Sequence, residues 1–310
     1  MADELKCIEN ISPVYTLALL QFPKTYWNYH DIEIPTLTAL PFQMDPFPFS
    51  KGAFGNVYRA SHTSNTFAVK VVTNADLVRN CKKEFKILQN LKSSIHIITA
   101  HNLFRYDDKI HFVFNYVENT PLPCLPHKIK TYMFQLLKAL DHCHSHAIIH
   151  CDVKPGNILF DSKNLLKLID FGRSKFYFPD HDYHESNELG TAKYRAPEML
   201  FKSKKIHYAV DIWAAGCVFL QLLNPEVFNR FCSGHNDATQ VENISRKFGP
   251  EKMKELCQKF NWSHFEFSKI DIEQWNIGAL ELNLLEKMLT LDPLQRITAK
   301  NALGHIYFLA

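Results

Sequence analysis

The segment between residues 150 and 172 carries polar side chains whose types and spacing suit phosphoryl transfer. It contains Asp152, Lys154, Asn157 and Asp170, and its sequence is HCDVKPGNILFDSKNLLKLIDFG. A carboxylate can accept the proton of a hydroxyl nucleophile, while a second carboxylate and an amide oxygen can hold the divalent ions that accompany a polyphosphate. The segment therefore predicts transfer of a phosphoryl group to a hydroxyl.

A glycine-rich turn occurs earlier in the chain. Its residues are Ser50, Lys51, Gly52, Ala53, Phe54, Gly55, Asn56 and Val57. Glycines let backbone N–H groups approach phosphates, so these residues are candidates for binding a nucleotide. Alone, the turn is equally compatible with a purely structural hairpin. A dinucleotide site is disfavoured because a strand is expected after the turn, where a helix should begin.

Lys70 is expected on a strand and Glu84 on the helix that follows it. Between residues 76 and 91 the apolar side chains recur at helical spacing, and Glu84 shares their face. An acid on the apolar face of a helix requires a partner. A Lys70–Glu84 pair would hold the ammonium where it can reach the α- and β-phosphates of a nucleotide, whereas the alternative is a solvated surface lysine.

A cluster of histidines and cysteines at residues 142–151, HCHSHAIIHC, raises the alternative of a zinc site. Ligands on one helix face need a spacing of four residues, and only His142 and His146 meet it. No second pair of ligands is evident, so zinc is disfavoured.

Composition limits the class of protein. The chain has 310 residues, 46% of them hydrophobic and 22% charged, and a net charge of +3. These values are typical of a soluble globular protein and give no reason to expect nucleic acid or a membrane as a direct partner. The eight cysteines are irregularly spaced, which favours reduced thiols in the cytoplasm or nucleus. No secretory signal and no apolar run of membrane-spanning length is expected.

The order of predicted elements indicates two lobes with a cleft between them. Strands are expected up to about residue 116, interrupted by the single helix that bears Glu84. After a proline-rich linker at 118–126, helices are expected at 129–144, 211–223, 250–260 and 280–289. Residues 1–35 form an N-terminal extension of unknown role whose aromatic side chains should pack against the rest of the chain. Glu198 and Arg296 lie in apolar surroundings and predict a buried ion pair.

Three further motifs complete a pattern: GTAKYRAPE at 190–198, DIWAAG at 211–216 and LDPLQR at 291–296. With them, the chain from about residue 45 onward resembles the eukaryotic serine/threonine protein kinases. The resemblance implies an α+β, two-lobed protein kinase fold, with a small antiparallel β-sheet and one helix in the N-lobe and a larger, mainly helical C-lobe. It places the domain at 36–310, divides the lobes near residue 117, and implies ATP and Mg²⁺.

The resemblance also assigns roles by position. Asp152 would accept the proton of the substrate hydroxyl, Lys154 would steady the transferred group, and Asn157 and Asp170 would hold the metal ions. Lys70, paired with Glu84, would contact the phosphates. Phe114 would guard the back of the adenine pocket, and Asn115 and Val117 would bind adenine through backbone hydrogen bonds. Lys154-Pro155 is similar to enzymes that act on protein serine and threonine.

Subfamily features point to a kinase of the cell cycle. Tyr194-Arg195 resembles the group of cyclin-dependent and casein-type kinases, and residues 236–260 resemble the kinase that fires replication origins with an activating subunit. The large insertions common in that kinase are missing here. The resemblance implies a regulatory subunit as partner and favours the nucleus over the cytoplasm. The remaining alternatives are a pseudokinase scaffold, a small-molecule phosphotransferase and a related kinase of another pathway.

Two charge features bear on regulation and specificity. Cys151 stands where related kinases carry an arginine that pairs with a phosphate on the segment between Asp170 and Glu198, called the activation segment below. We therefore expect activity without phosphorylation of this segment. A group of five basic residues, called the basic cluster below, predicts a preference for acidic substrates. The alternative is a solvated basic surface. The cluster comprises Lys193, Arg195, Lys202, Lys204 and Lys205.

Overall fold

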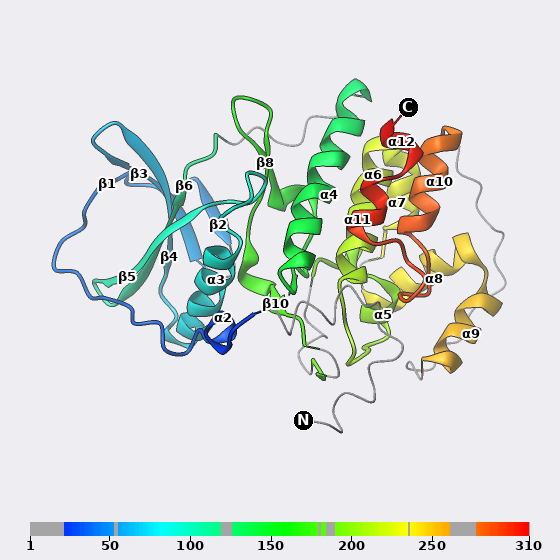
Figure 1. Ribbon diagram of the computed structural model, residues 1–310, viewed down its shortest axis with the longest axis horizontal. Coiled ribbons are helices and arrows are strands. Elements are labelled where there is room, and N and C mark those ends of the chain that lie inside the picture. The colour runs from blue at the N-terminus through cyan, green and yellow to red at the C-terminus, as the bar shows by residue number, and fades with distance from the viewer. Residues whose placement is uncertain are drawn as a thin grey trace.

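The computed structural model describes residues 22–52, 55–118, 126–178, 181–183, 190–234, 236–260 and 277–309. Within these ranges the chain forms two lobes (Figure 1). A twisted antiparallel sheet and helix α3 make up the N-lobe, and helices α4 to α12 make up most of the C-lobe. The predicted α+β, two-lobed fold is confirmed. Ala53, Phe54 and residues 1–21 of the extension lie outside the described residues.

The N-lobe sheet has six strands in the order β1-β3-β4-β6-β5, with β2 paired to β3. The strands are β1 Gln43–Met44, β2 Ser50–Gly52, β3 Gly55–His62, β4 Asn65–Val72, β5 Ala100–Tyr106 and β6 Lys109–Asn115. The β5–β6 turn places Asp107 and Asp108 at φ 49° and 55°. Positive φ at both central residues suits the twist of a tight hairpin, and aspartate tolerates this conformation well.

Helix α3, Val78–Asn90, packs one face against the N-lobe sheet. Its buried residues are Cys81, Glu84, Ile87 and Leu88, the stripe that helical spacing predicts. A short 3₁₀ turn, Ala75–Leu77, leads into it and is capped by the side chain of Asn74. The fold thus delivers Glu84 to the interior, opposite β4, which carries Lys70.

The C-lobe is built around helix α6, Ala209–Leu223, which is buried along almost its whole length. Its helices are α4 Ile129–Ser145, α5 Pro197–Leu200, α6, α7 Pro225–Phe231, α8 Asp237–Phe248, α9 Pro250–Lys259, α10 Ala279–Met288, α11 Ala299–Leu303 and α12 Ile306–Leu309. The four helices expected from the sequence are confirmed within two residues at each end. None of the helices that the structure describes is long and apolar enough to cross a membrane.

Short strands frame the segment expected to carry the chemistry. They are β7 Ile148–Ile149, β8 Ile158–Phe160, β9 Leu166–Leu168 and β10 Lys175–Phe176. Strands β8 and β9 form one hairpin, and β7 pairs with β10. Because both ends of the 150–172 segment are paired in this way, its loops are held at the junction of the two lobes (Figure 1).

The predicted ion pair between Glu198 and Arg296 is confirmed. Two guanidinium nitrogens of Arg296 donate to the two carboxylate oxygens of Glu198 at 2.7 and 3.0 Å, and both side chains are buried. The pair ties helix α5 to the loop before α11, which explains why two charges can be tolerated in the core.

Candidate active site

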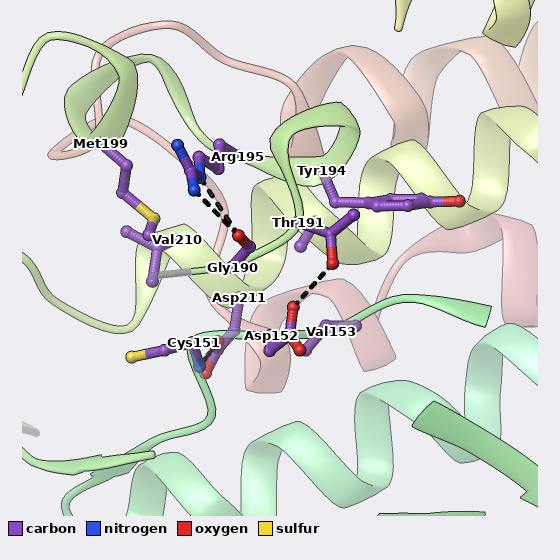
Figure 2. A pocket seen from close by; sticks show the side chains of 11 residues that line it. Cys151, Asp152, Val153, Gly190, Thr191, Tyr194, Arg195, Met199, Val210 and Asp211 are labelled. Carbon is purple, nitrogen blue, oxygen red and sulfur yellow. Dashed lines mark hydrogen bonds between the residues drawn. The ribbon is translucent and has the colours of Figure 1, made fainter. Parts of the chain in front are cut away.

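Asp152 lies at the centre of a hydrogen-bonded group. Its Oδ2 accepts hydrogen bonds from the ammonium of Lys154 at 2.7 Å and from the amide nitrogen of Asn157 at 3.2 Å. Its Oδ1 accepts a hydrogen bond of 3.1 Å from the hydroxyl of Thr191, shown in Figure 2. The carboxylate is buried yet fixed in orientation from three directions, as a group that must aim at one substrate atom requires.

The loop that carries Asp152 is held by helix α6. The backbone N–H groups of His150 and Cys151 donate to Oδ2 and Oδ1 of Asp211, each at 2.8 Å. Asp211 lies in the first turn of α6, where the helix dipole favours a negative charge. His144 also contacts this carboxylate, at 3.0 Å. The buried helix therefore positions the loop through its backbone and leaves the side chain of Asp152 to the site.

Lys70, Glu84 and Asp170 form the second group. The ammonium of Lys70 lies 3.1 Å from Oε2 of Glu84 and 4.0 Å from Oδ1 of Asp170. Burial opposes the charge on Lys70, but the two carboxylates outweigh it and hold the pKa of Lys70 above its ordinary value. Burial raises the pKa of Glu84, and Lys70 partly offsets that rise. The predicted Lys70–Glu84 pair is confirmed.

The backbone around Asp170 is turned sharply. Asp170 has φ 60°, and Phe171, the next residue, is fully buried with its ring 4.7 Å from that of His150. An aspartate accepts this left-handed conformation more readily than most residues. The turn directs the carboxylate of Asp170 toward Lys70 while Phe171 anchors the segment in the core.

The glycine turn lies beside Lys70 through strand pairing. Ser50, Lys51 and Gly52 of β2 pair with Val57, Asn56 and Gly55 of β3, and Val57 in turn pairs with Lys70 of β4. At Gly55, with φ 139°, a Cβ atom would lie only 2.5 Å from the carbonyl oxygen of Val71. Glycine is required there so that the turn can fold back over the sheet.

Two comparisons with known proteins identify the family. Residues 49–308 match the family described as "Protein kinase domain". The chain is also similar to cyclin-dependent kinase 20 of Danio rerio, with 31% identity over 280 residues, which covers 83% of this chain and 80% of that protein. This chain belongs to the protein kinase family. It is similar to the cyclin-dependent group, which supports action on serine and threonine.

Protein kinase domains generally use ATP and Mg²⁺, and the residues of this kinase fit both. Oδ1 of Asp170 is buried and has no hydrogen-bond partner among the described residues. The amide nitrogen of Asn157 donates hydrogen bonds to Asp152. The amide oxygen of Asn157 is therefore the atom that could bind a metal ion. Mg²⁺ binds through one or two such oxygens together with phosphates of its nucleotide. Gly172 leaves open the space beside Asp170, where a Cβ atom would come within 3.2 Å of Oδ1.

The strand end expected to bind adenine is only partly available. Asn115 is the last residue of β6, and its backbone N–H donates to the carbonyl of Thr99 at 3.0 Å. The backbone carbonyl of Asn115 is therefore the group that remains available to bind adenine. Val117 is partly buried and packs against the main core of the kinase, as does Phe114.

The histidine cluster serves structure. His144 contacts Asp211, Nε2 of His150 contacts the carbonyl of Ile169 at 3.0 Å, and Nδ1 of His146 contacts the carbonyl of His142 at 2.8 Å. Across the described ranges, no group of three His, Cys, Asp or Glu side chains is placed to hold a metal ion.

Thr191 is a site residue that sequence reasoning missed. Its hydroxyl donates to Asp152 and accepts a hydrogen bond of 2.9 Å from Lys154, which links the activation segment to the catalytic loop. The motif GTAKYRAPE contains this threonine, but nothing in the local spacing indicates which distant carboxylate it contacts. Only the tertiary fold brings residues 152 and 191 together.

Cys151 and Arg195 lie on the wall of a small cavity beneath the activation segment (Figure 2). The cavity has a volume of about 10 Å³, enough for one water molecule. Burial raises the pKa of the Cys151 thiol well above its ordinary value, so the thiol is neutral. Arg195 donates to the carbonyl of Gly190 and forms an ion pair of 2.8 Å with Asp237. Its charge is thereby neutralised within the kinase.

Proposed function

We propose that this kinase transfers the γ-phosphoryl group of ATP to serine and threonine hydroxyls of proteins, with Asp152 as the base. The observation that carries the proposal is the assembled carboxylate of Asp152, held by Lys154, Asn157 and Thr191. The substrate oxygen attacks the γ-phosphorus, the bond to the bridging oxygen of ADP breaks, and the hydroxyl proton passes to Asp152.

The other residues position the nucleotide. The ammonium of Lys70, oriented by Glu84, contacts the α- and β-phosphates, and residues 50–57 cover them with backbone N–H groups. Asn157 and Asp170 would hold Mg²⁺, which would neutralise charge on the phosphates. Lys154 contacts the transferred group, and Asn115 and Val117 bind adenine.

The test replaces the proposed base. Asp152→Asn should lower kcat by about a hundredfold or more, because proton transfer is lost while ATP binding is kept. The matched control is Asp108→Asn, an exposed turn residue whose left-handed conformation asparagine also accepts. Unchanged turnover of Asp152→Asn would refute the assigned role. Wild-type turnover would also rule out the pseudokinase alternative.

For specificity, we propose a preference for acidic or phosphorylated sites. Arg195 is paired with Asp237 and Lys205 with Asp182, at 2.8 and 2.9 Å. Four members of the basic cluster are exposed and support the proposal, namely Lys193, Lys202, Lys204 and, although it is paired with Asp182, Lys205. A peptide array should show acidic residues enriched beside the acceptor, and a preference for basic or proline-directed sites would contradict this.

For regulation, we propose activity without phosphorylation of the activation segment. Cys151 is buried and neutral, so it offers no positive charge to a phosphate. Phosphatase treatment of the purified, partner-bound kinase should leave its specific activity unchanged. Loss of activity after dephosphorylation would refute the proposal.

For biological role, we propose a nuclear kinase of cell-cycle or DNA-replication control that binds a regulatory subunit. The similarity to a protein named cyclin-dependent kinase 20 supports this role. So does the resemblance of residues 236–260, which form α8 and α9, to the origin-firing kinase. Affinity purification, followed by kinase assays with and without the recovered subunit, should show higher activity with it. Exclusion of the kinase from nuclei would contradict the role.

A further inference from the structure

Residues 22–36 lie between the two lobes and contact both. In Figure 1 helix α2, Lys24–Trp27, lies beside β10 and below α3, and the chain then follows the lower edge of the N-lobe. The whole of this segment precedes the kinase family match, which begins at residue 49. Its contacts therefore call for an explanation specific to this chain.

The segment binds the outer face of α3. Asn90 donates to the carbonyl of Tyr26 at 3.0 Å, Lys82 donates to the carbonyl of His30 at 3.2 Å, and Arg79 donates to the hydroxyl of Tyr29 at 3.4 Å. At 100° per residue, positions 79, 82 and 90 fall on one side of the helix, opposite position 84. Helix α3 is thus held between the N-terminal segment on one face and Lys70 on the other.

The same segment is fixed to the C-lobe through aromatic side chains. The hydroxyl of Tyr26 donates to the carbonyl of His146, just after α4, at 2.7 Å. The ring of Trp27 lies 5.4 Å from Phe176 and 5.1 Å from Phe178, in the strand and loop that follow Asp170-Phe171-Gly172. Aromatic contacts at these distances stabilise beyond the apolar area that they bury, so they hold the segment against the C-lobe.

A third attachment fixes the far end of the segment to the sheet. The backbone N–H of Arg105 in β5 donates to the carbonyl of Pro35 at 2.8 Å, and Leu37 donates back to Arg105 at 2.9 Å. Beyond it, Leu37, Leu40, Phe42 and Met44 pack against the sheet face opposite α3. The segment is therefore anchored on both sides of α3 and cannot shift without breaking one anchor.

These contacts have a consequence for catalysis. Glu84 is buried, and its carboxylate is satisfied only while α3 stays close to β4. If α3 moved outward, the carboxylate of Glu84 would be hydrated and its pairing with Lys70 would be lost. Tyr26 binds α3 through its backbone carbonyl and binds the C-lobe through its hydroxyl. It therefore opposes an outward movement of α3 directly.

We propose that residues 22–36 are a positioning element for phosphoryl transfer, which clamps α3 so that Glu84 stays paired with Lys70. The inference deepens the proposed function and rests on it. Tyr26 and Trp27 are positioning residues that act through α3. The clamp gives the chain basal activity of its own, and a regulatory subunit would raise that activity without having to supply the inward position of α3.

The test uses the full-length chain with Trp27→Ala. Release of α3 should raise the KM for ATP and lower kcat, together reducing kcat/KM for ATP by about tenfold, the effect of a shift of about 1.4 kcal/mol between two positions. The KM for the peptide substrate should stay unchanged. Amide hydrogen exchange should accelerate in α3 and stay unchanged in α6. Trp27→Phe should restore the wild-type KM for ATP, kcat and exchange in α3. Lys24 is an exposed residue of the same helix, and Lys24→Ala should match the wild type.

Several outcomes would overturn the clamp. Wild-type kinetics together with wild-type exchange in α3 would do so, as would a fall in kcat at unchanged KM for ATP with exchange faster throughout, which indicates general destabilisation. If Trp27→Ala fails to fold, Asn90→Ala removes the contact with Tyr26 alone and should show the same pattern more weakly. If the wild type transfers no phosphate, the proposed function fails, and the exchange measurement still decides the clamp.

Discussion

The hydroxyl of Thr191 joins the activation segment to Asp152, donating to Oδ1 at 3.1 Å while accepting from Lys154 at 2.9 Å. Oδ2 of the same carboxylate accepts from Lys154 and Asn157. Lys154 and Asn157 hold one oxygen of the proposed base, and the other oxygen is held only when the activation segment is in place. Substrate binding, which this segment would support, and chemistry are coupled through one threonine.

Thr191→Val should lower kcat by about ten- to a hundredfold, because a hydrogen bond to a charged group contributes about 1.5–3 kcal/mol and valine cannot replace it. Thr191→Ser keeps the hydroxyl and should retain most activity. Steady-state kinetics measure both, and Thr73→Val, an exposed threonine of the N-lobe, serves as control. Equal rates for the valine and serine variants would exclude a role for the hydroxyl.

Gly172→Ala probes the space beside Asp170, whose carboxylate is proposed to bind the metal ion. Its Cβ atom would lie 3.2 Å from Oδ1 of Asp170 and 3.5 Å from Oε2 of Glu84. We expect the KM for ATP to rise by about fivefold or more, since overpacking costs about 1–3 kcal/mol and here falls on the phosphate-binding groups. The control Gly304→Ala meets only an ordinary contact of 3.6 Å and should bind ATP normally. Tight ATP binding by Gly172→Ala would argue against this placement of the nucleotide.

Arg296→Ala tests the buried ion pair. Arg296 also donates to the carbonyls of Ala209, Leu291 and Thr290, and its guanidinium lies 5.1 Å from the ring of Trp213. Removing it leaves Glu198 charged and buried, so the free energy of unfolding in urea should fall by about 3–5 kcal/mol. Lys300→Ala, an exposed residue of α11, should change it little. The double variant Glu198→Gln/Arg296→Ala should lose less than Arg296→Ala, and a larger loss would contradict the charge argument.

Local patterns in the sequence predicted much of the site. Glu84 was identified because an acid on an apolar helix face is costly without a partner, and Lys70 is that partner at 3.1 Å. The same reasoning found the pair of Glu198 and Arg296. Asp152 and Asp170 were found from their spacing within one short segment. The two ion pairs were predicted correctly because burial of charge imposes a strong local constraint, whereas the roles of Asp152 and Asp170 in catalysis and metal binding stay predictions.

Other features depend on contacts that no local pattern contains. Tyr26 meets Asn90 and His146, which are 64 and 120 positions away in the chain. Thr191 likewise contacts Asp152, a residue far from it in the chain. The helices of four to seven residues, α5, α7, α11 and α12, are too short for a helical period to show. Helix α8 did carry a local signal, a capping box formed by Asn236 and Thr239, which sequence reasoning did not use.

Stability in acid should depend on His207, which is half-buried just before α6. Its Nδ1 accepts a hydrogen bond of 3.1 Å from the backbone of Ala209, and its Nε2 has no hydrogen-bond partner among the residues described. Burial lowers its pKa from 6.5 to about 4, against the opposing effect of Glu198. The other ionisable groups that act on it are Arg296, His144 and Asp292.

Because the pKa of His207 is lower in the folded state, the unfolded chain binds an additional proton between pH 6.5 and 4. The contribution of His207 to stability is therefore complete above pH 6.5 and is lost as the pH falls toward 4, by about 3 kcal/mol in all. His207→Asn keeps an acceptor for Ala209 and removes the titrating group. Urea unfolding at pH 7, 6, 5 and 4 should show a smaller loss for this variant, whereas His181→Asn, at the surface, should follow the wild type. If the free energy of unfolding falls equally with pH in the wild type and in His207→Asn, His207 does not control stability in acid.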